Sequence, residues 1–537
     1  MSTSQMKGSS LNKEAQNSKG SGEGSIFRSI LALFTGPECR KIVPMLIMVF
    51  LICFNYSILR NLKDALTVTA KGSSAGVIPF VKVYAMLPMA IFMTIVFNKL
   101  SERFSQDKVI YYMISGFLAF FAIFAFVLFP NRELLHPHAF ADQAELILPK
   151  FFQPFISMIR NWSYTAFYVM SELWSSMILS VIFYGFVNEV VKVSSARVYY
   201  SAITIFANLS TILAGTVGSY FSQDIFFSFI PFGEDSWEQG FLILISLVLI
   251  GGLATIYTFR WLNKNVLNSP SYTDLHHTFK KREKKKKLSI KESIRHLFQN
   301  RYMLWISILV VGYNLVINLI EIVWKDQLRE LYPNGKEFGN ILFQVTTWVG
   351  ILSFITAIFM NYIMKICGWV GSALICPLVM LVTSILYFGV NLLGSVESNL
   401  LIFGASPLAL AVFIGAVQNC ISKAAKYTVF DATKEMTLIP LDHEVKLRGK
   451  AAIDGVGSRF GKSGGSLIHQ GLFSIFHSTS ASLPVVAVVV MITISGWLYA
   501  VKALGKLFND LITQKGETID VEPIQEVVTT EKEAITA

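Results

Sequence analysis

The sequence predicts an all-α membrane protein with about twelve transmembrane helices, arranged as two halves of six. Of its 537 residues, 53% are hydrophobic and only 15% are charged, whereas soluble domains average about 25% charged residues. Apolar runs recur along the whole chain, each long enough to supply the roughly 20 helical residues that cross a bilayer. One strongly basic stretch, KKREKKKK at 280–287, separates the first six runs from the last six.

The apolar runs define the expected spans, and their grouping defines the two halves. The spans are expected at 43–69, 77–98, 109–129, 163–191, 199–222, 239–260, 301–325, 338–365, 369–393, 400–421, 450–476 and 482–503. Two six-helix bundles at 41–260 and 301–503 are therefore predicted, with a basic linker at 261–300 and polar tails at 1–40 and 504–537. This pseudo-repeat resembles the major-facilitator architecture, in which the substrate site lies between the halves near the midplane of the membrane.

The loops between the spans differ in charge, and this difference predicts the orientation. One set of loops is basic and includes Lys99, Lys192, Lys365 and the segment 423–450, whereas the opposite loop at 222–238 has four carboxylates and no Lys or Arg. Because cationic loops are retained in the cytoplasm, both termini are expected there. The basic linker is expected to lie against anionic lipid head groups, and a phosphate-binding patch is the alternative.

Four ionisable residues lie well inside apolar runs or on a polar stripe. They are Lys63 in RNLKDAL, Glu172 in YVMSELWSS, Glu321 in NLIEIVWK and Lys462 in RFGKSGGS. A charge at the centre of a spanning helix costs about 2.5–3.5 kcal/mol on insertion scales, so a functional role is the first expectation. Charges nearer helix ends, such as Lys82 and Lys325, are expected to set topology or to form structural pairs.

Helical spacing groups further polar residues with these four. Residues 56, 60, 63 and 67 and residues 314, 318, 321 and 325 share the spacing i, i+4, i+7, i+11, which places each set on one helical face. Asp454 and Ser458 precede Lys462 at intervals of four, and the Asp–Lys pair is expected either to hold the helix in place or to open to substrate. The secondary candidates for substrate binding are Arg60, Tyr168, Asn314, Asn318, Asp454 and Ser458.

Several kinds of chemistry are excluded by spacing. The string around Lys462 suggests a phosphate loop, but the required first glycine is Val456 and the context is an apolar helix. The five cysteines are scattered, so neither a disulfide framework nor a metal site is expected. His136 and His138 lack ligand spacing and are expected on the surface. No catalytic residue, cofactor or metal is predicted.

Long stretches of the chain resemble one family of membrane transporters. The stretches are NYSILRNLKDALTVTAKGSSA, FYVMSELWSSMILSVIFYGF, NLIEIVWK, AVQNCISKAAKYTVFDATKEMTLIPLD and GKAAIDGVGSRFGKSGGSLIHQG. They are similar to the nucleotide transporters of plastids and obligate intracellular bacteria, the non-mitochondrial ATP/ADP translocases, over roughly residues 38–510. The resemblance implies functional roles for a lysine of NLKD, a glutamate of SELW, a glutamate of NLxE and a lysine of GKSGG. These are Lys63, Glu172, Glu321 and Lys462.

The resemblance also implies a substrate and a location. It implies exchange of external ATP for internal ADP by alternating access, in a bacterial inner membrane or the inner envelope membrane of a plastid. The expected partners are the nucleotide and membrane lipid, with no nucleic acid and no obligate protein partner. Proton-coupled symport, or exchange of GTP, UTP or CTP, stays open. A polytopic membrane enzyme is a remote alternative, because no catalytic or metal-binding constellation is found.

The charge of a nucleotide gives these residues a physical role. A nucleotide brings about three or four negative charges into a low-dielectric site, where fixed cations must meet them. Lys63 and Lys462 are expected to supply those cations from opposite halves. Glu172 and Glu321 have the wrong sign for phosphate. They are expected to pair with lysines, to select an amino group of the base, or to carry a proton.

Overall fold

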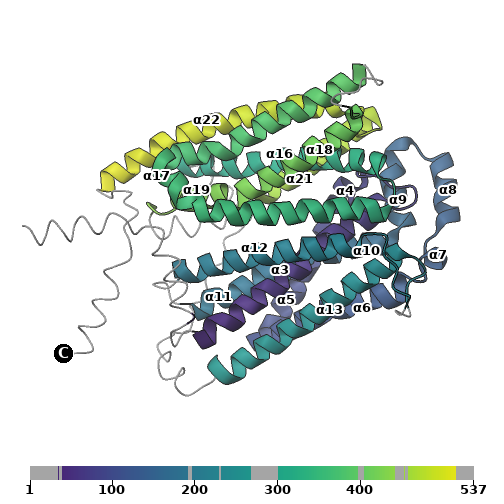
Figure 1. Ribbon diagram of the computed structural model, residues 1–537, viewed down its shortest axis with the longest axis horizontal. Coiled ribbons are helices and arrows are strands. Elements are labelled where there is room, and N and C mark those ends of the chain that lie inside the picture. Colours follow the sequence, from purple (N-terminus) through teal and green to yellow (C-terminus); the bar gives the residue numbers. More distant parts are fainter. Residues whose placement is uncertain are drawn as a thin grey trace, which may run out of the picture.

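The computed structural model describes residues 39–191, 196–228, 232–267, 300–396, 404–441 and 458–515, with the single residues 34 and 453. Throughout this part of the chain the secondary structure is helical, with no strand. Figure 1 shows the helices of the N-terminal half, in purple and teal, beside those of the C-terminal half, in green and yellow. The long helices run roughly parallel to one another. A helix satisfies its own backbone hydrogen bonds, which a segment must do to cross a bilayer.

The N-terminal half contains long helices, five short α-helices and five segments of π or 3₁₀ geometry. Its elements are α3 (Cys39–Val68), α4 (Val77–Phe80), η2 (Val81–Met86), α5 (Leu87–Arg103), α6 (Gln106–Ile123), η3 (Phe124–Leu128), α7 (Arg132–Leu135), α8 (His138–Ile147), η4 (Lys150–Phe152), α9 (Gln153–Arg160), α10 (Trp162–Leu173), η5 (Trp174–Phe183), α11 (Tyr184–Val190), α12 (Ala196–Phe221), α13 (Ser236–Leu262) and η7 (Asn263–Leu267). Of these, η4 is a 3₁₀-helix and the other η segments are π-helices.

The C-terminal half is built from fewer and longer helices. Its elements are α16 (Arg301–Leu331), α17 (Gly335–Val396), α18 (Pro407–Ala425), η8 (Lys426–Phe430), α19 (Asp431–Thr437), α21 (Ser458–Phe476) and α22 (Leu483–Lys515). Two spans share α17, because the chain breaks direction at Gly368, whose φ of 63° is one that glycine adopts without a Cβ clash. Side-chain caps start the helices: Asn300 accepts hydrogen bonds from the first turn of α16, and Ser406 does so for α18.

Eleven helices of the described chain are long and apolar enough to cross a membrane, one fewer than the twelve spans expected. The remaining expected span, 450–476, contains α21, which lies between α16 and the N-terminal half. Polar residues and glycines such as Lys462, Gly464 and His469 make α21 less apolar than its neighbours. The first helix begins and the last ends at the same end of the molecule (Figure 1). This agrees with an even number of crossings.

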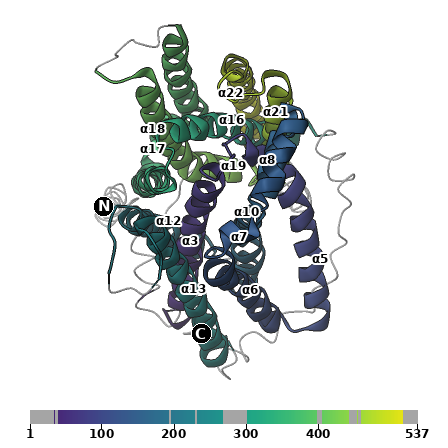
Figure 2. The ribbon, with the colours of Figure 1, turned by 90° about the vertical axis from the view of Figure 1, so that its right-hand side faces the viewer.

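The two ends of the bundle are built differently. We call the end where α3 and α16 begin the proximal end, and the end where they finish the distal end. Figure 2 views the molecule from the distal end, with α7 and α8 nearest the viewer. Arg160, at the end of α9, holds α8 in place through Asp142 and Glu145, at 2.5 and 3.1 Å.

The halves pack most closely along α12 and α17. A Cβ on Gly218 would lie 2.1 Å from the Phe343 ring, and one on Gly350 would lie 2.7 Å from the side chain of Ile212. Small residues at such contacts let two helices approach closely within a membrane. The described hydrogen bonds and ion pairs that join the halves lie between the level of Arg60 and the distal loops.

Two expectations from the sequence are corrected by the fold. The sequence places Lys423 in a basic segment after the tenth span, but α18 continues through it, and the side chain is buried. The sequence places His136 on the surface, but it is buried, and its Nε2 lies 2.7 Å from the Ser163 hydroxyl. Burial lowers the pKa of His136 to about 4, so the imidazole is neutral at neutral pH.

Candidate functional site

Seven charged side chains from both halves form one continuous network of ion pairs. They come from α3, α10, α16 and α18, and every link is 3.6 Å or shorter. The members of this network, which we call the inter-half network, are Arg60, Lys63, Asp64, Glu172, Glu321, Lys325 and Lys423. A charged side chain inside a membrane-spanning bundle costs free energy unless it is paired. Each of the seven has at least one partner of opposite sign.

In the N-terminal half the network is centred on Lys63. Its ammonium lies 2.8 Å from Asp64 and 3.4 Å from Glu172, and only 4% of its side chain is exposed. It also lies 3.8 Å from the centroid of the Tyr168 ring, within the range of a cation–π interaction. The aromatic face and two carboxylates therefore hold one ammonium that α3 carries into the apolar interior.

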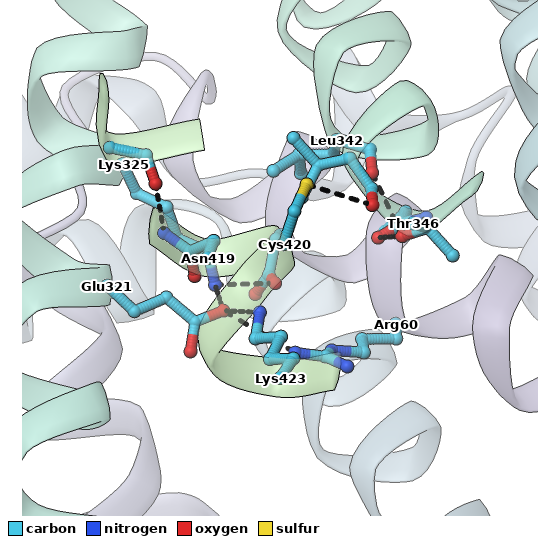
Figure 3. A network of polar contacts seen from close by, with 12 residues as sticks. Arg60, Glu321, Lys325, Leu342, Thr346, Asn419, Cys420 and Lys423 are labelled. Carbon is cyan, nitrogen blue, oxygen red and sulfur yellow. Dashed lines mark hydrogen bonds and ion pairs between the residues drawn. The ribbon is translucent and has the colours of Figure 1, made fainter. Parts of the chain in front are cut away.

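In the C-terminal half the network is centred on Glu321 (Figure 3). One of its oxygens lies 3.0 Å from Lys325, one turn along α16, and 3.1 Å from Lys423 on α18. Arg60 of α3 reaches the same oxygen at 3.6 Å. A single carboxylate thus collects cations from three helices, including one from the opposite half.

Besides Arg60–Glu321, one buried ion pair carries the network across the boundary between the halves, and a polar contact lies beside it. Asp64 accepts Lys63 on one carboxylate oxygen and Lys325 on the other, each at 2.8 Å. Beside it, the Asn61 amide donates to the Thr346 hydroxyl at 2.9 Å. Arg60 of the polar face predicted on the first span therefore meets Glu321 of the face predicted on the seventh, nearer the distal ends of α3 and α16 than their middles.

Lys462 lies close to this network without an ion pair to any residue in the described ranges. Its side chain is exposed, and its ammonium interacts electrostatically with the carboxylate of Glu172 and the hydroxyl group of Tyr427. The Asn318 amide donates to the Lys462 carbonyl at 3.0 Å, which places Lys462 about one helical turn proximal to Glu321. A ligand that enters from the proximal end would meet this ammonium before it meets the network.

A second cation, Lys82, also lies near the inter-half network without an ion pair to a described residue. It lies in η2, the π-helical segment of the second span, and η2 packs against both α10 and α21. The Lys82 side chain is half-buried, and its ammonium interacts electrostatically with the carboxylates of Glu172 and Glu321. No described residue forms an ion pair with it. π-Helical segments often mark functional sites, and this one turns a lysine toward the carboxylates.

The charge balance of the region favours an anionic ligand. The inter-half network holds four cations and three anions, which leaves a net charge of +1. Among the described residues, adding Lys82 and Lys462 makes six cations against three anions, a net charge of +3. The described residues contain no group of three or more His, Cys, Asp or Glu side chains that could hold a metal ion.

The other predicted site residues take different places. Asn314 bonds to Val310 of its own helix, and a Cβ on Gly461 would touch it, so it lies in the packing between α16 and α21. Asn318 holds the same interface. Ser458 is the first residue of α21, and Asp454 lies outside the described residues. Gly461, beside Lys462, therefore lies against α16.

Sequence reasoning did not name four charged residues of this region as substrate-binding candidates: Asp64, Lys325, Lys423 and Lys82. It expected Lys325, on the polar face of the seventh span, and Lys82 to set topology or to form structural pairs. Asp64 directly follows Lys63, and Lys325 follows Glu321 at i+4, so the local sequence could have predicted an ion pair for each of them. Lys423 and Lys82 stand near the ends of apolar runs, where a lysine ordinarily extends toward the lipid head groups. Nothing in their local sequence separates that role from burial.

Comparison with known proteins gives the same family over nearly the whole chain. Residues 17–508 match the family model described as TLC ATP/ADP transporter. The ADP,ATP carrier protein 1 of Chlamydia pneumoniae is 40% identical over 485 residues, which cover 90% of this chain and 94% of that protein. The chloroplastic ADP,ATP carrier protein 2 of Arabidopsis thaliana is 38% identical over 478 residues, covering 89% of this chain and 76% of that protein.

A solved structure shares the fold. A D-xylose–proton symporter superposes with a TM-score of 0.50 at 12% sequence identity, over 87% of this chain and 97% of that chain. At this identity the likeness concerns the fold alone. It confirms the all-helical, major-facilitator-like class predicted from the sequence.

Two glycines of α21 provide a matched test of how Lys462 is positioned. In Gly461→Ala the new Cβ would lie 2.7 Å from the Asn314 Cβ and 2.9 Å from the Val311 carbonyl oxygen, whereas in Gly464→Ala it would meet nothing within 4 Å. We expect Gly461→Ala to lower the stability by about 1–3 kcal/mol, as overpacking does, and Gly464→Ala to change it little. Thermal unfolding in detergent checks this, and equal effects of the two changes would contradict the described packing of α21.

Proposed function

Because the chain belongs to the TLC ATP/ADP transporter family, we propose that it exchanges ATP for ADP across a membrane by alternating access. The observation that carries the proposal is the inter-half network with two neighbouring ammonium groups, Lys82 and Lys462, which have no ion-pair partner among the described residues. A site between two halves is reached from each side in turn when the halves rock against one another. The site then acts as a binding site for the nucleotide and has no catalytic role.

The phosphate chain would bind where cations outnumber carboxylates. Entering from the proximal end, it would first meet Lys462 on α21, with Lys82 on η2 beside the same carboxylate, Glu172. Lys63 lies 3.4 Å from that carboxylate, so a phosphate oxygen could replace Glu172 as the partner of Lys63. A local charge of +3 then faces the roughly three or four negative charges of ADP or ATP, and charge-assisted hydrogen bonds make such contacts strong.

The glutamates would act as exchangeable partners for the cations. Of the three roles predicted for them, pairing with lysines has direct geometric support, because Glu172 binds Lys63 and Glu321 binds Lys325 and Lys423. Pairing keeps each buried ammonium compensated when no phosphate is near. When phosphate takes over the cations, the freed carboxylates could accept hydrogen bonds from the amino group of the base.

The orientation follows from the basic loops. Lys99 lies near the end of α5, and Lys365 lies near the break of α17 at Gly368; each follows a return crossing from the distal end, so the proximal end would face the cytoplasm, or the interior of a plastid. Both termini would lie on that side. In this orientation the inter-half network closes the external side, and the proximal side receives internal ADP before external ATP is taken up.

The transport mode can be tested in liposomes that contain the purified protein. We expect uptake of labelled ATP to require internal ADP and to be insensitive to a protonophore, because the nucleotide itself would neutralise the cations of the site. GTP, UTP and CTP offered in the same way test the base selectivity. Uptake that needs a pH gradient and no internal nucleotide would replace exchange with proton symport.

The roles of Lys462 and Lys63 can be tested by removing each ammonium. Charge-assisted contacts contribute roughly 1.5–3 kcal/mol, so Lys462→Ala and Lys63→Ala should each weaken ADP binding by about tenfold to a hundredfold. Lys63→Ala should also lower thermal stability, because it leaves Asp64 and Glu172 with one cation fewer. The exposed Lys99 of α5 supplies the control variant, Lys99→Ala. Wild-type affinity in Lys63→Ala or Lys462→Ala would remove that lysine from the site.

A further inference from the structure

The most deeply buried ion pair between the halves is the contact of Asp64 with Lys325. The two side chains are 4% and 7% exposed, and their charged atoms lie 2.8 Å apart. Two other ion pairs of the described residues join the halves: Arg60 with Glu321 at 3.6 Å, with side chains 25% and 18% exposed, and Asp224 with Lys336 at the distal surface, with side chains 81% and 22% exposed. All three pairs must break when the distal end opens, and of these only the largely exposed Asp224–Lys336 pair is already compensated by water in the closed state.

Breaking the buried pair changes the charge balance on each side of the boundary. Asp64 would keep Lys63 as its partner, and Lys325 would keep Glu321, which already serves Lys423 and Arg60. The C-terminal half would then hold Lys325 and Lys423 against the single carboxylate Glu321. An excess cation in a low-dielectric interior is costly, so the distal end cannot open without a substitute anion.

A bound nucleotide supplies that anion. Its phosphates would compensate the cations that lose a carboxylate when the halves separate, so the loaded protein can change conformation. A protein without nucleotide has no such compensation and stays closed at the distal end.

Resting on the exchange activity proposed above, we propose that the Asp64–Lys325 pair prevents the conformational change in the absence of nucleotide and so makes exchange obligatory. Asp64 and Lys325 are positioning residues in this account, because they act by holding the halves together. A ligand-dependent change of conformation needs a free-energy difference between the two states that the ligand alone supplies. Breaking the buried pair supplies the cost of opening in the absence of ligand, and the bound nucleotide offsets that cost because its phosphates replace the lost carboxylate.

The measured quantity is the ratio of labelled ADP uptake into liposomes without internal nucleotide to uptake with internal ADP. For the wild-type protein this ratio should be near zero. The double variant Asp64→Asn/Lys325→Gln removes one charge of each sign, so the net charge of the network is unchanged while the buried pair is lost. We expect its ratio to rise by about tenfold or more, within the range typical of coupling between sites.

Two further variants make the result specific. Asp64→Asn alone breaks the same contact and should raise the ratio in the same direction. Asp224→Asn/Lys336→Gln removes the exposed pair between the halves and should leave the ratio at its wild-type value. A labelled sugar that the protein does not bind checks that the vesicles are sealed.

Three outcomes would overturn either the inference or the obligatory exchange on which it rests. If Asp64→Asn/Lys325→Gln and Asp64→Asn still show the wild-type ratio, the pair does not prevent the conformational change and this inference is wrong. If the wild-type protein itself takes up ADP without internal nucleotide, obligatory exchange is wrong, whatever the variants do. A rise in the control variant equal to that in the double variant would also overturn the inference, because any contact between the halves would then suffice.

Discussion

Asp64 accepts one ammonium from each half of the molecule, and the arrangement of the site depends on this shared carboxylate. Removing one partner from a buried ion pair costs about 3–5 kcal/mol, although replacing the whole pair with apolar residues can be neutral. The pair therefore selects one arrangement of the halves more than it stabilises the fold. A difference of this size favours the closed distal end by a factor of about a hundred or more, which a polyanionic ligand could offset.

The amino-acid sequence predicts the fold class and much of the site for clear physical reasons. Charged side chains inside apolar runs are costly, and this cost alone marks four residues in the sequence: Lys63, Glu172, Glu321 and Lys462. Helical spacing then places polar faces on the first and seventh spans, and in the folded protein Arg60 of one face meets Glu321 of the other. Asp64, which lies outside the predicted face of the first span, binds Lys325 of the face on the seventh. Polar residues at helical spacing within an apolar span therefore predict that this side of the helix packs against another polar surface.

Other parts of the site depend on contacts between distant segments. The pairing of Lys423 with Glu321 joins α18 to α16 across 102 residues, and a lysine near the end of an apolar run carries no local sign of it. Lys82 is turned toward the carboxylates by a π-helical segment that hydropathy cannot predict. The glycines beside Lys462 are compatible with either a helix or a phosphate at close range, and only the packing of Gly461 against Asn314 decides for the helix.

The central claim, that nucleotide replaces the contacts between the halves, can be measured as a distance. Spin labels at Gln223, near the distal end of α12, and at Glu330, near the distal end of α16, would report the separation of the halves without replacing any residue of the network. In lipid without nucleotide, the account predicts one short distance, and with saturating ADP a second, longer population. A long population already present without ADP, or a distribution that ADP leaves unchanged, would contradict it.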